Sequence, residues 1–207
     1  MVRSHPATQR NRQIGRLRPL EIKQRNEEMT DVRVYFADLA AYNAGTLHGV
    51  WVDLSIHTDE ESIYGEIRKM LEQSPEHGAE EWAIHDYEGF GPVRLSEYMG
   101  IKELAELAEL IVEHGDTVLA WISDQSVDYI DDFDADRLYG TYESERDWAW
   151  AFTEEFEESV KEMARKEHGE EMALLIKIDY DEAVMIAKCN WGWSFVDYDG
   201  KVYVFTQ

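Results

Sequence analysis

Cysteine and long apolar runs are both scarce in this chain of 207 residues. The one cysteine, Cys189, has no second thiol with which to form an intramolecular disulfide, so we expect a reducing compartment. No apolar run approaches the roughly 18 residues of a membrane span, and the N-terminus lacks the apolar stretch of a secretory signal. The sequence therefore predicts a cytoplasmic protein that makes no contact with membranes.

Lysine and arginine are also few, with 20 of them against 44 Asp and Glu, which gives a net charge of -24. The imbalance is uneven. Residues 1–30 hold seven basic and three acidic residues, a net charge of +4, which leaves -28 for residues 31–207. A surface so acidic repels phosphate groups. The composition thus excludes DNA, RNA and anionic membranes as ligands of the main part of the chain, and it predicts cationic partners.

Motifs of the common nucleotide-binding and hydrolytic enzymes are missing. The chain has no G-x-S-x-G nucleophile elbow, no P-loop and no G-x-G-x-x-G phosphate cradle. Pairs suited to acid–base catalysis could be chosen almost anywhere among 44 acids, so no pair stands out. We therefore predict no enzymatic activity and no cofactor.

The stretch AIHDYEGF, residues 83–90, places His85, Asp86 and Glu88 close together in sequence. A metal site needs ligands that converge in space, and His85 has no partner at the spacing of H-x-x-x-H or C-x-x-C. On an alternating strand, His85 and Asp86 point to opposite faces. We interpret the three residues as a strand-end cluster with no shared site.

A second acidic pattern is similar to a calcium-binding loop. Asp132, Asp134, Asp136 and Glu143 occupy positions 1, 3, 5 and 12 of that template. Position 6 requires glycine for a sharp turn, and this chain has Arg137 there. We interpret the stretch as an acidic loop and predict no metal site. A metal-dependent enzyme that uses Asp132, Asp134 and Glu143 is the alternative, and it predicts a large thermal shift with calcium.

The distribution of charge and the positions of glycine and proline divide the chain into an extension and three domains. Residues 1–30 are basic and lack an apolar period, which predicts a disordered tail. A basic arm that touches nucleic acid is the alternative, and Met29 is an alternative start. Gly89, Gly91 and Pro92 predict a domain boundary. We expect an N-terminal α+β domain over 31–92, a middle helical domain over 93–131 and a C-terminal α+β domain over 132–207.

The N-terminal domain is expected to combine a small sheet with one helix. Patterns rich in β-formers at 32–39 and 48–54 flank a turn at Asn43–Gly45, which predicts a hairpin. Thr58 and Glu61 have the spacing of a capping box that opens a helix. Residues 80–90 then supply the third strand.

Helical periods dominate the next part of the chain. Residues 101–115 carry apolar side chains on one face and glutamates on the other, and residues 117–130 predict a second helix. A capping box at Ser144 and Asp147 opens a long helix over 144–167. The apolar stripe of that helix consists of Trp148, Phe152, Phe156, Val160 and Met163.

The C-terminal end predicts a helix followed by a hairpin. Residues 180–189 favour a helix, whereas 173–178 are ambiguous between strand and helix. Residues 191–205 predict two strands that turn at Asp199–Gly200. Together these elements predict the α+β fold class.

The acidic residues themselves are the most distinctive feature. Residues 124–162 hold fourteen acids and three basic residues, and such crowding of like charges costs stability. Carboxylates one helical turn apart lie about 5–6 Å from each other, comparable with neighbouring phosphates along a nucleic-acid strand. We therefore predict a surface that imitates a DNA backbone, although solubility, halophilic adaptation or contact with any basic protein also explains an acidic excess. The residues predicted to form this surface are Glu103, Glu106, Glu109, Glu113, Asp124, Asp128, Asp131, Asp132, Asp134, Asp136, Glu143, Asp147, Glu154, Glu155, Glu157, Glu158 and Glu162.

Four blocks of the sequence resemble the ArdA family of antirestriction proteins. They occur in the family's order, and their combination is specific, with AIHDYE as its most telling piece. The blocks are VRVYFADLAAYNAGTLHGVWVDL (32–54), EEWAIHDYEGF (80–90), LYGTYESERDWAWAFTEEF (138–156) and KIDYDEAVMIAKCNWGWSFVDYDGKVYVF (177–205). Two features depart from the family pattern: the basic extension at 1–30, and the cations Lys161, Arg165 and Lys166 within the acidic stretch.

The resemblance implies an elongated monomer of three small domains that forms a homodimer through the C-terminal domain. It also implies that the acids imitate the phosphates of bent B-form DNA. The implied partner is a type I restriction-modification enzyme, whose methyltransferase core and specificity subunit form the groove that would be occluded, so that incoming mobile DNA is protected. The hairpin with Trp191, Trp193 and Phe195 is a candidate dimer contact. The alternative function is an acidic adaptor that binds basic nucleoid proteins or other cationic proteins.

Overall fold

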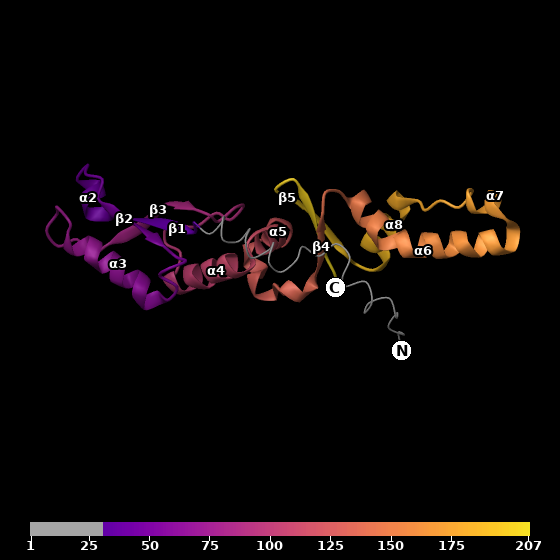
Figure 1. The fold of residues 1–207 in the computed structure, drawn as a ribbon. Coiled ribbons are helices and arrows are strands. Elements are labelled where there is room, and N and C mark those ends of the chain that lie inside the picture. The colour runs from indigo at the N-terminus through magenta and orange to yellow at the C-terminus, as the bar shows by residue number, and fades with distance from the viewer. Residues whose placement is uncertain (1–30) are drawn as a thin grey trace. The chain divides into compact units, whose positions relative to one another are not determined.

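The computed structural model describes residues 31–207, except for the side chains of residues 127–129. The predicted tail at 1–30 and the alternative start at Met29 lie outside the described residues. The described chain divides into two compact units, which meet in sequence between Phe133 and Asp134; Figure 1 labels their elements. The division into three domains remains a prediction. No helix in the described part is both long and apolar enough to cross a membrane.

A three-stranded antiparallel sheet forms the centre of the first unit. β1 (Arg33–Asp38) lies between β2 (Gly49–Asp53) and β3 (Trp82–Glu88), and α3 (Glu60–Glu72) packs on one face (Figure 1). Alternate residues of a strand point to the same face, and the buried side chains of β1 and β2 on the α3 face are Val34, Phe36 and Val52. The three strands and the helix predicted for this region are confirmed.

Two local predictions in the first unit are wrong in detail. The first strand ends at Asp38 because its carboxylate Oδ1 accepts hydrogen bonds from Ala40 N and Ala41 N, and this caps a short helix, α2 (Leu39–Asn43). Thr58 does not cap α3. Instead Asp59 Oδ1 accepts from Ser62 N at 2.9 Å, since an aspartate one residue later offers the stronger acceptor at the N-cap.

Two helices complete the first unit. α4 (Ile101–His114) buries the apolar face that the sequence predicts, including Leu104, Leu107 and Ile111. α5 (Asp116–Gln125) is shorter than predicted, because Ser126 has a φ of 83° that ends the helix. The chain continues as a 3₁₀ helix, η2 (Val127–Asp132).

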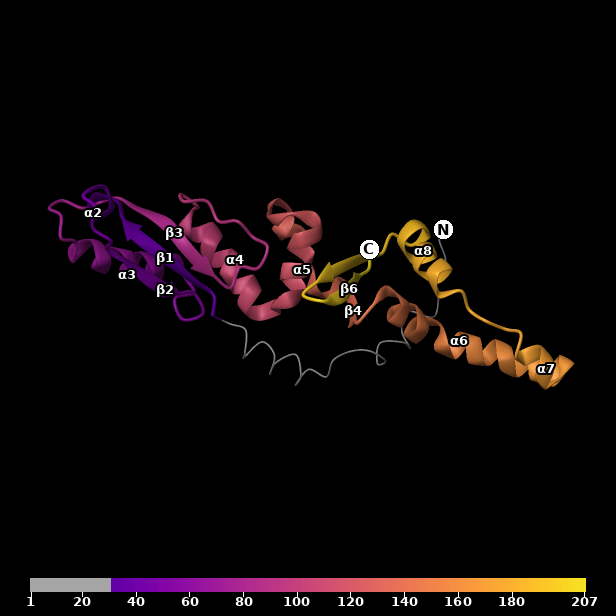
Figure 2. The ribbon, with the colours of Figure 1, turned by 90° about the horizontal axis from the view of Figure 1, so that it is seen from above.

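The second unit combines a three-stranded sheet with helices (Figure 2). β6 (Lys201–Phe205) lies between β4 (Leu138–Tyr142) and β5 (Ser194–Tyr198), and a short 3₁₀ helix, η3 (Ala135–Arg137), precedes β4. The helices are α6 (Glu145–His168), α7 (Glu170–Ala173) and α8 (Tyr180–Asn190). The core that α6 and α8 share with the sheet consists of Trp148, Ala149, Val184, Ala187, Val202 and Val204, whereas α7 packs against α6. Both units are mixed helix and sheet, so the α+β prediction is confirmed.

The predicted N-cap of α6 and the predicted turn of the terminal hairpin are both confirmed. Asp147 N donates to Ser144 Oγ at 3.1 Å and so caps α6. The terminal hairpin pairs Tyr198 with Lys201, and its turn residues Asp199 and Gly200 both have positive φ, as a type I′ turn requires. β4 was missed by the sequence analysis, which assigned the preceding acids to a loop.

The apolar stripe of α6 is buried only at its N-terminal end. Trp148 is fully buried and stacks on Phe152 with ring centroids 5.0 Å apart. Phe156 and Met163, one and three turns further on, are 62% and 57% exposed. The apolar stripe predicted for α6 therefore packs on the shared core only over the first half of the helix, and the second half extends past that core.

Candidate acidic binding surface

The glutamates of α4 form the most regular row of exposed acids. Glu103, Glu106, Glu109 and Glu113 are all exposed on the face of α4 opposite the buried Leu104. They follow one another at intervals of three or four residues, which places neighbouring Cβ atoms about 5–6 Å apart. The apolar periodicity that buries one face of α4 thus also orders the carboxylates on the other face.

Few cations lie along this row. Lys102 Nζ is 3.5 Å from Glu106 Oε1, and both side chains are largely exposed. His114 lies beside Glu113 at 3.8 Å and contributes charge only when protonated. Among residues 31–207, no basic side chain pairs with Glu103 or Glu109. The row therefore keeps most of its negative charge.

A second group of predicted acids follows α5. Asp124 is exposed and accepts a hydrogen bond from Gln125 Nε2 at 2.6 Å, whereas the side chain of Asp128 is outside the described residues. Asp131 and Asp132 are exposed at the end of η2 in the first unit. No cation from the described part of the chain pairs with either of them.

The acids that match a calcium loop have other roles. Asp134 Oδ1 accepts from Asp136 N at 2.9 Å and caps η3, while Glu143 lies beyond β4 and is 3.8 Å from Lys201 Nζ. Arg137 Nε donates to Thr206 O, so its side chain points to the end of β6. Among the described side chains of residues 31–126 and 130–207, no three His, Cys, Asp or Glu converge to hold a metal ion.

The predicted acids of α6 fall into two groups. Asp147, Glu154 and Glu155, nearer the N-terminus, are exposed, and no basic side chain among the described residues pairs with them. Glu158 and Glu162, further along, each pair with cations of the same helix. Net charge is therefore concentrated on the first half of α6.

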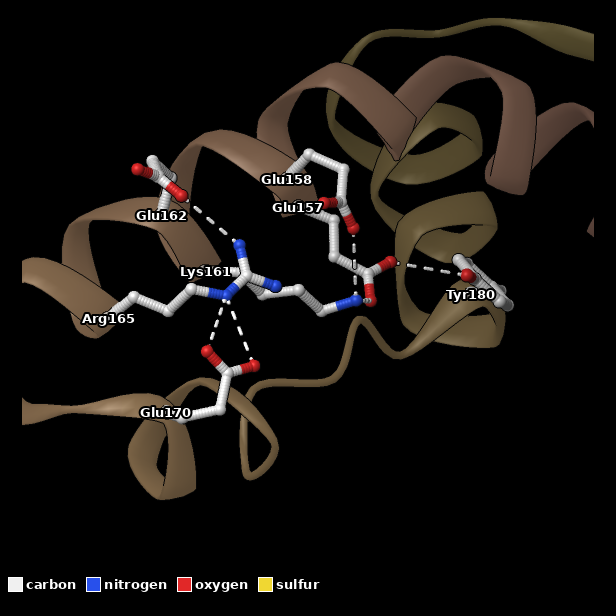
Figure 3. Close-up of polar contacts among 7 residues, drawn as sticks. All are labelled: Glu157, Glu158, Lys161, Glu162, Arg165, Glu170 and Tyr180. Carbon is white, nitrogen blue, oxygen red and sulfur yellow. Dashed lines mark hydrogen bonds and ion pairs between the residues drawn. The ribbon is translucent and has the colours of Figure 1, made fainter.

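Figure 3 shows the network that neutralises the second half of α6. Lys161 Nζ lies 2.7 Å from Glu157 Oε1 and 3.3 Å from Glu158 Oε1. Arg165 joins Glu162 to Glu170, with N–O distances of 3.2 and 3.1 Å. These contacts hold α7 against the end of α6. Because cations occupy their oxygens, these carboxylates are poorer phosphate substitutes than the acids of α4.

Ionisation in this network follows from the same contacts. The hydrogen bond from Lys161 lowers the pKa of Glu157, with burial acting in the opposite direction. Hydrogen bonds from Arg165 and Lys166 lower the pKa of Glu162. Partial burial, together with the nearby Glu157 carboxylate, raises the pKa of Tyr180. Glu157 and Glu162 thus stay ionised at neutral pH while their charge is balanced locally.

His85, Asp86 and Glu88 do not share a site. The His85 ring contacts the edge of Tyr42, with centroids 4.7 Å apart, whereas Asp86 Oδ1 accepts from Tyr87 N. Glu88 instead pairs with Arg33 across the strands at 2.6 Å. This last contact was missed by the sequence analysis, although the alternation of Arg33 with buried valines in β1 marks it as a residue of the outer sheet face.

The comparison with protein-family models agrees with the sequence blocks. A search of curated proteins found no match. Residues 34–200 match the family model described as Antirestriction protein (ArdA), which covers most of the chain and includes elements of both units. The chain therefore belongs to the ArdA family of antirestriction proteins, a membership that indicates an antirestriction function and an interaction with restriction-modification enzymes.

Proposed function

We propose that the chain inhibits type I restriction-modification enzymes by placing its carboxylates where the phosphates of B-form DNA would bind. The groove it occupies is the one formed by the methyltransferase core and the specificity subunit. Occlusion of this groove protects incoming mobile DNA inside the cytoplasm. The process makes and breaks no bond, so it requires neither a catalytic residue nor a cofactor.

The row of glutamates on α4 is the observation that carries this proposal. A protein groove that binds DNA is lined with Lys and Arg, and such side chains are attracted by carboxylates at regular spacing. Glu103 and Glu109 offer their charge without an internal cation to displace, at least from residues 31–207. The acids at 131–136 and those in the first half of α6 extend the supply of exposed charge.

The second half of α6 has a different role in this proposal. Its acids are paired with Lys161, Arg165 and Lys166, while Phe156 and Met163 remain exposed. Two copies of a chain with a net charge of -24 repel each other except where charge is balanced. We infer that the homodimer forms through this part of the C-terminal unit. Trp193 and Phe195 are less suitable because they pack against the core of their own chain.

Inhibition of ATP-dependent cleavage by a type I enzyme tests the main proposal. Increasing amounts of the folded protein should reduce cleavage at low salt, and the inhibition should weaken as salt rises because charge pairs between exposed groups are screened. Added DNA without recognition sites should compete with the inhibitor. If a correctly folded sample leaves cleavage unchanged at low salt, the proposal is wrong.

Sedimentation or light scattering tests the dimer separately. The parent chain should behave as a dimer, and Phe156→Ser with Met163→Ser should shift it to a monomer. The matched control is Leu47→Ser with Ile56→Ser, which alters two exposed apolar residues of the first unit. A monomeric parent chain would exclude the dimer without affecting the proposal about the groove.

A further inference from the structure

The outer face of the first sheet carries an aromatic and charged surface that the acidic rows do not explain. The strand register pairs Tyr35 with both Trp51 and Asp86, and it pairs Arg33 with Glu88. Residues paired in this way point to the same face of a sheet. The face opposite α3 therefore brings these five side chains together.

Two aromatic rings form the centre of this face. The ring centroids of Tyr35 and Trp51 are 5.6 Å apart, and Trp51 is 39% exposed. The Tyr35 ring lies over Gly49 of β2, since a Cβ atom at that glycine would come within 2.5 Å of Tyr35 Oη. Gly49 thus leaves room for an aromatic ring to lie against the strand.

Arg33 shows how this face binds a guanidinium group. Its Cζ lies 4.9 Å from the centroid of the Trp51 ring. Two of its nitrogens contact Glu88 Oε2 at 2.7 and 2.6 Å. A guanidinium stacks on an aromatic face while it donates to a carboxylate in its own plane. The chain's own arginine satisfies both requirements at one end of the face.

An aromatic side chain and a carboxylate, Tyr35 and Asp86, also occur at the neighbouring position of the sheet, where the described residues place no guanidinium. Asp86 lies opposite Tyr35 in the strand register and is exposed. Its Oδ1 accepts only the backbone N–H of Tyr87 at 2.9 Å. No cation from residues 31–207 pairs with it. Tyr35 and Asp86 thus stand opposite each other on neighbouring strands, on the same face as Trp51, Arg33 and Glu88.

We propose that Tyr35 and Asp86 bind an arginine side chain of the protein partner, stacked on the ring and paired with the carboxylate. The inference rests on the proposed function, in which that partner presents a groove lined with basic side chains. It adds a directional contact to the long-range attraction of the acidic rows. Arginine is favoured over lysine because only the planar guanidinium can stack and donate in one plane.

A titration with basic peptides tests the site without any restriction enzyme. The full chain is titrated with hexa-arginine and, separately, with hexa-lysine of equal charge, and the indole N–H signal of Trp51 is followed by NMR. Hexa-arginine should shift this signal with an affinity at least about threefold higher than hexa-lysine, because stacking adds to charge attraction. Trp51→Phe assigns the signal.

Three variants separate the site from general acidity. Asp86→Asn and Tyr35→Leu should each reduce the arginine affinity to the lysine value. Asp197→Asn, which removes an exposed strand aspartate of the other unit, should leave the preference intact. Asp86→Asn changes no packed side chain, so it remains informative if Tyr35→Leu fails to fold.

Three outcomes would overturn the inference. Equal affinity for the two peptides at the Trp51 signal removes the arginine preference. An unchanged preference in Asp86→Asn removes the site. Binding that occurs only after residues 1–28 are deleted assigns the site to the chain's own arginines instead of a partner's. If cleavage is inhibited but the peptides are not distinguished, only this inference fails. If the peptides are distinguished but cleavage continues, only the proposed function fails.

Discussion

Glu157 and Lys161 of α6 form an ion pair at 2.7 Å in which the two side chains are only 15% and 23% exposed. The hydroxyl of Tyr180, the first residue of α8, donates to the same glutamate at 3.3 Å. The pair therefore links α6 to α8.

Replacement of this carboxylate gives a prediction for stability against pH. Lys161 lowers the pKa of Glu157 in the folded state, so the pair stabilises the fold above the ordinary glutamate pKa of about 4.3. That contribution is lost as the pH falls through the lower folded value. We expect Glu157→Gln to lower the melting temperature by about 1–3 °C at pH 7. The difference should shrink as the pH falls below about 4.

Thermal unfolding of both proteins between pH 3 and pH 7 measures this difference. Glu171→Gln is the control, because Glu171 is exposed in α7 and makes no ion pair with the described residues. It should match the parent chain throughout. A gap between Glu157→Gln and the parent that stays constant with pH would show that the lost contact is one of packing and not of charge.

Substitutions at two glycines with nearly equal φ distinguish the cost of backbone strain from the cost of a steric clash. Gly89 and Gly45 have φ values of +84° and +85°. A Cβ atom at Gly89 would lie 2.7 Å from Asp31 O, whereas none of the described atoms lies within 4 Å at Gly45. We expect Gly45→Ala to cost about 1 kcal/mol for the left-handed backbone alone. Gly89→Ala should cost about 1–3 kcal/mol more.

Urea unfolding provides the two free energies of unfolding. The slope with urea should stay the same in both variants, which shows that the unfolded state is unchanged. Equal losses in the two variants would mean that the chain near Asp31 moves aside freely.

Sequence patterns predicted those parts of the fold that depend on local chemistry. The Ser144–Asp147 box and the Asp199–Gly200 turn are fixed by contacts between neighbours in sequence, and both are present. The cap of α3 was assigned one residue early because Thr58 and Asp59 are both acceptable acceptors. Aspartate ranks above threonine as an N-cap residue, which favours Asp59, the cap that the structure has.

Features that depend on distant residues could not be predicted in this way. The periodicity of α6 predicts an apolar face but does not say how far the sheet beneath it extends, so the exposure of Phe156 and Met163 was missed. The pairing of Arg33 with Glu88 joins residues 55 positions apart. The ion pairs on α6 are a different case, because Lys161 with Glu157 and Arg165 with Glu162 are four and three residues apart. This local spacing could have indicated them from the sequence.

Ser126 gives a prediction in which a substitution stabilises the chain. Its φ of 83° and ψ of 151° lie in a region that glycine alone adopts readily. Its backbone N–H donates a hydrogen bond to Ile122 O at 2.9 Å, and any residue except proline can keep this hydrogen bond. We expect Ser126→Gly to raise the free energy of unfolding by about 1 kcal/mol. Ser126→Ala should give no gain. Urea unfolding measures the free energy of unfolding of both variants.

The row of acids on α4 gives a prediction for inhibition that compares two variants of equal net charge. The variant Glu103→Gln, Glu106→Gln, Glu109→Gln and Glu113→Gln removes the row. The control variant Glu72→Gln, Glu76→Gln, Glu80→Gln and Glu81→Gln removes four exposed acids of the same unit that lie outside the predicted surface. Both variants lose the same formal charge, so their long-range attraction to a basic groove falls by similar amounts.

Inhibition of a type I enzyme by these two variants decides whether the order of the carboxylates matters. Loss of the α4 row should weaken inhibition by about tenfold or more, equivalent to about 1.4 kcal/mol of binding free energy, and should reduce its dependence on salt. The control should weaken it less than about threefold. A single change such as Glu158→Gln should have little effect, because binding is spread over many carboxylates. Equal losses in the two fourfold variants would mean that total acidity, rather than a phosphate-like row, drives the interaction.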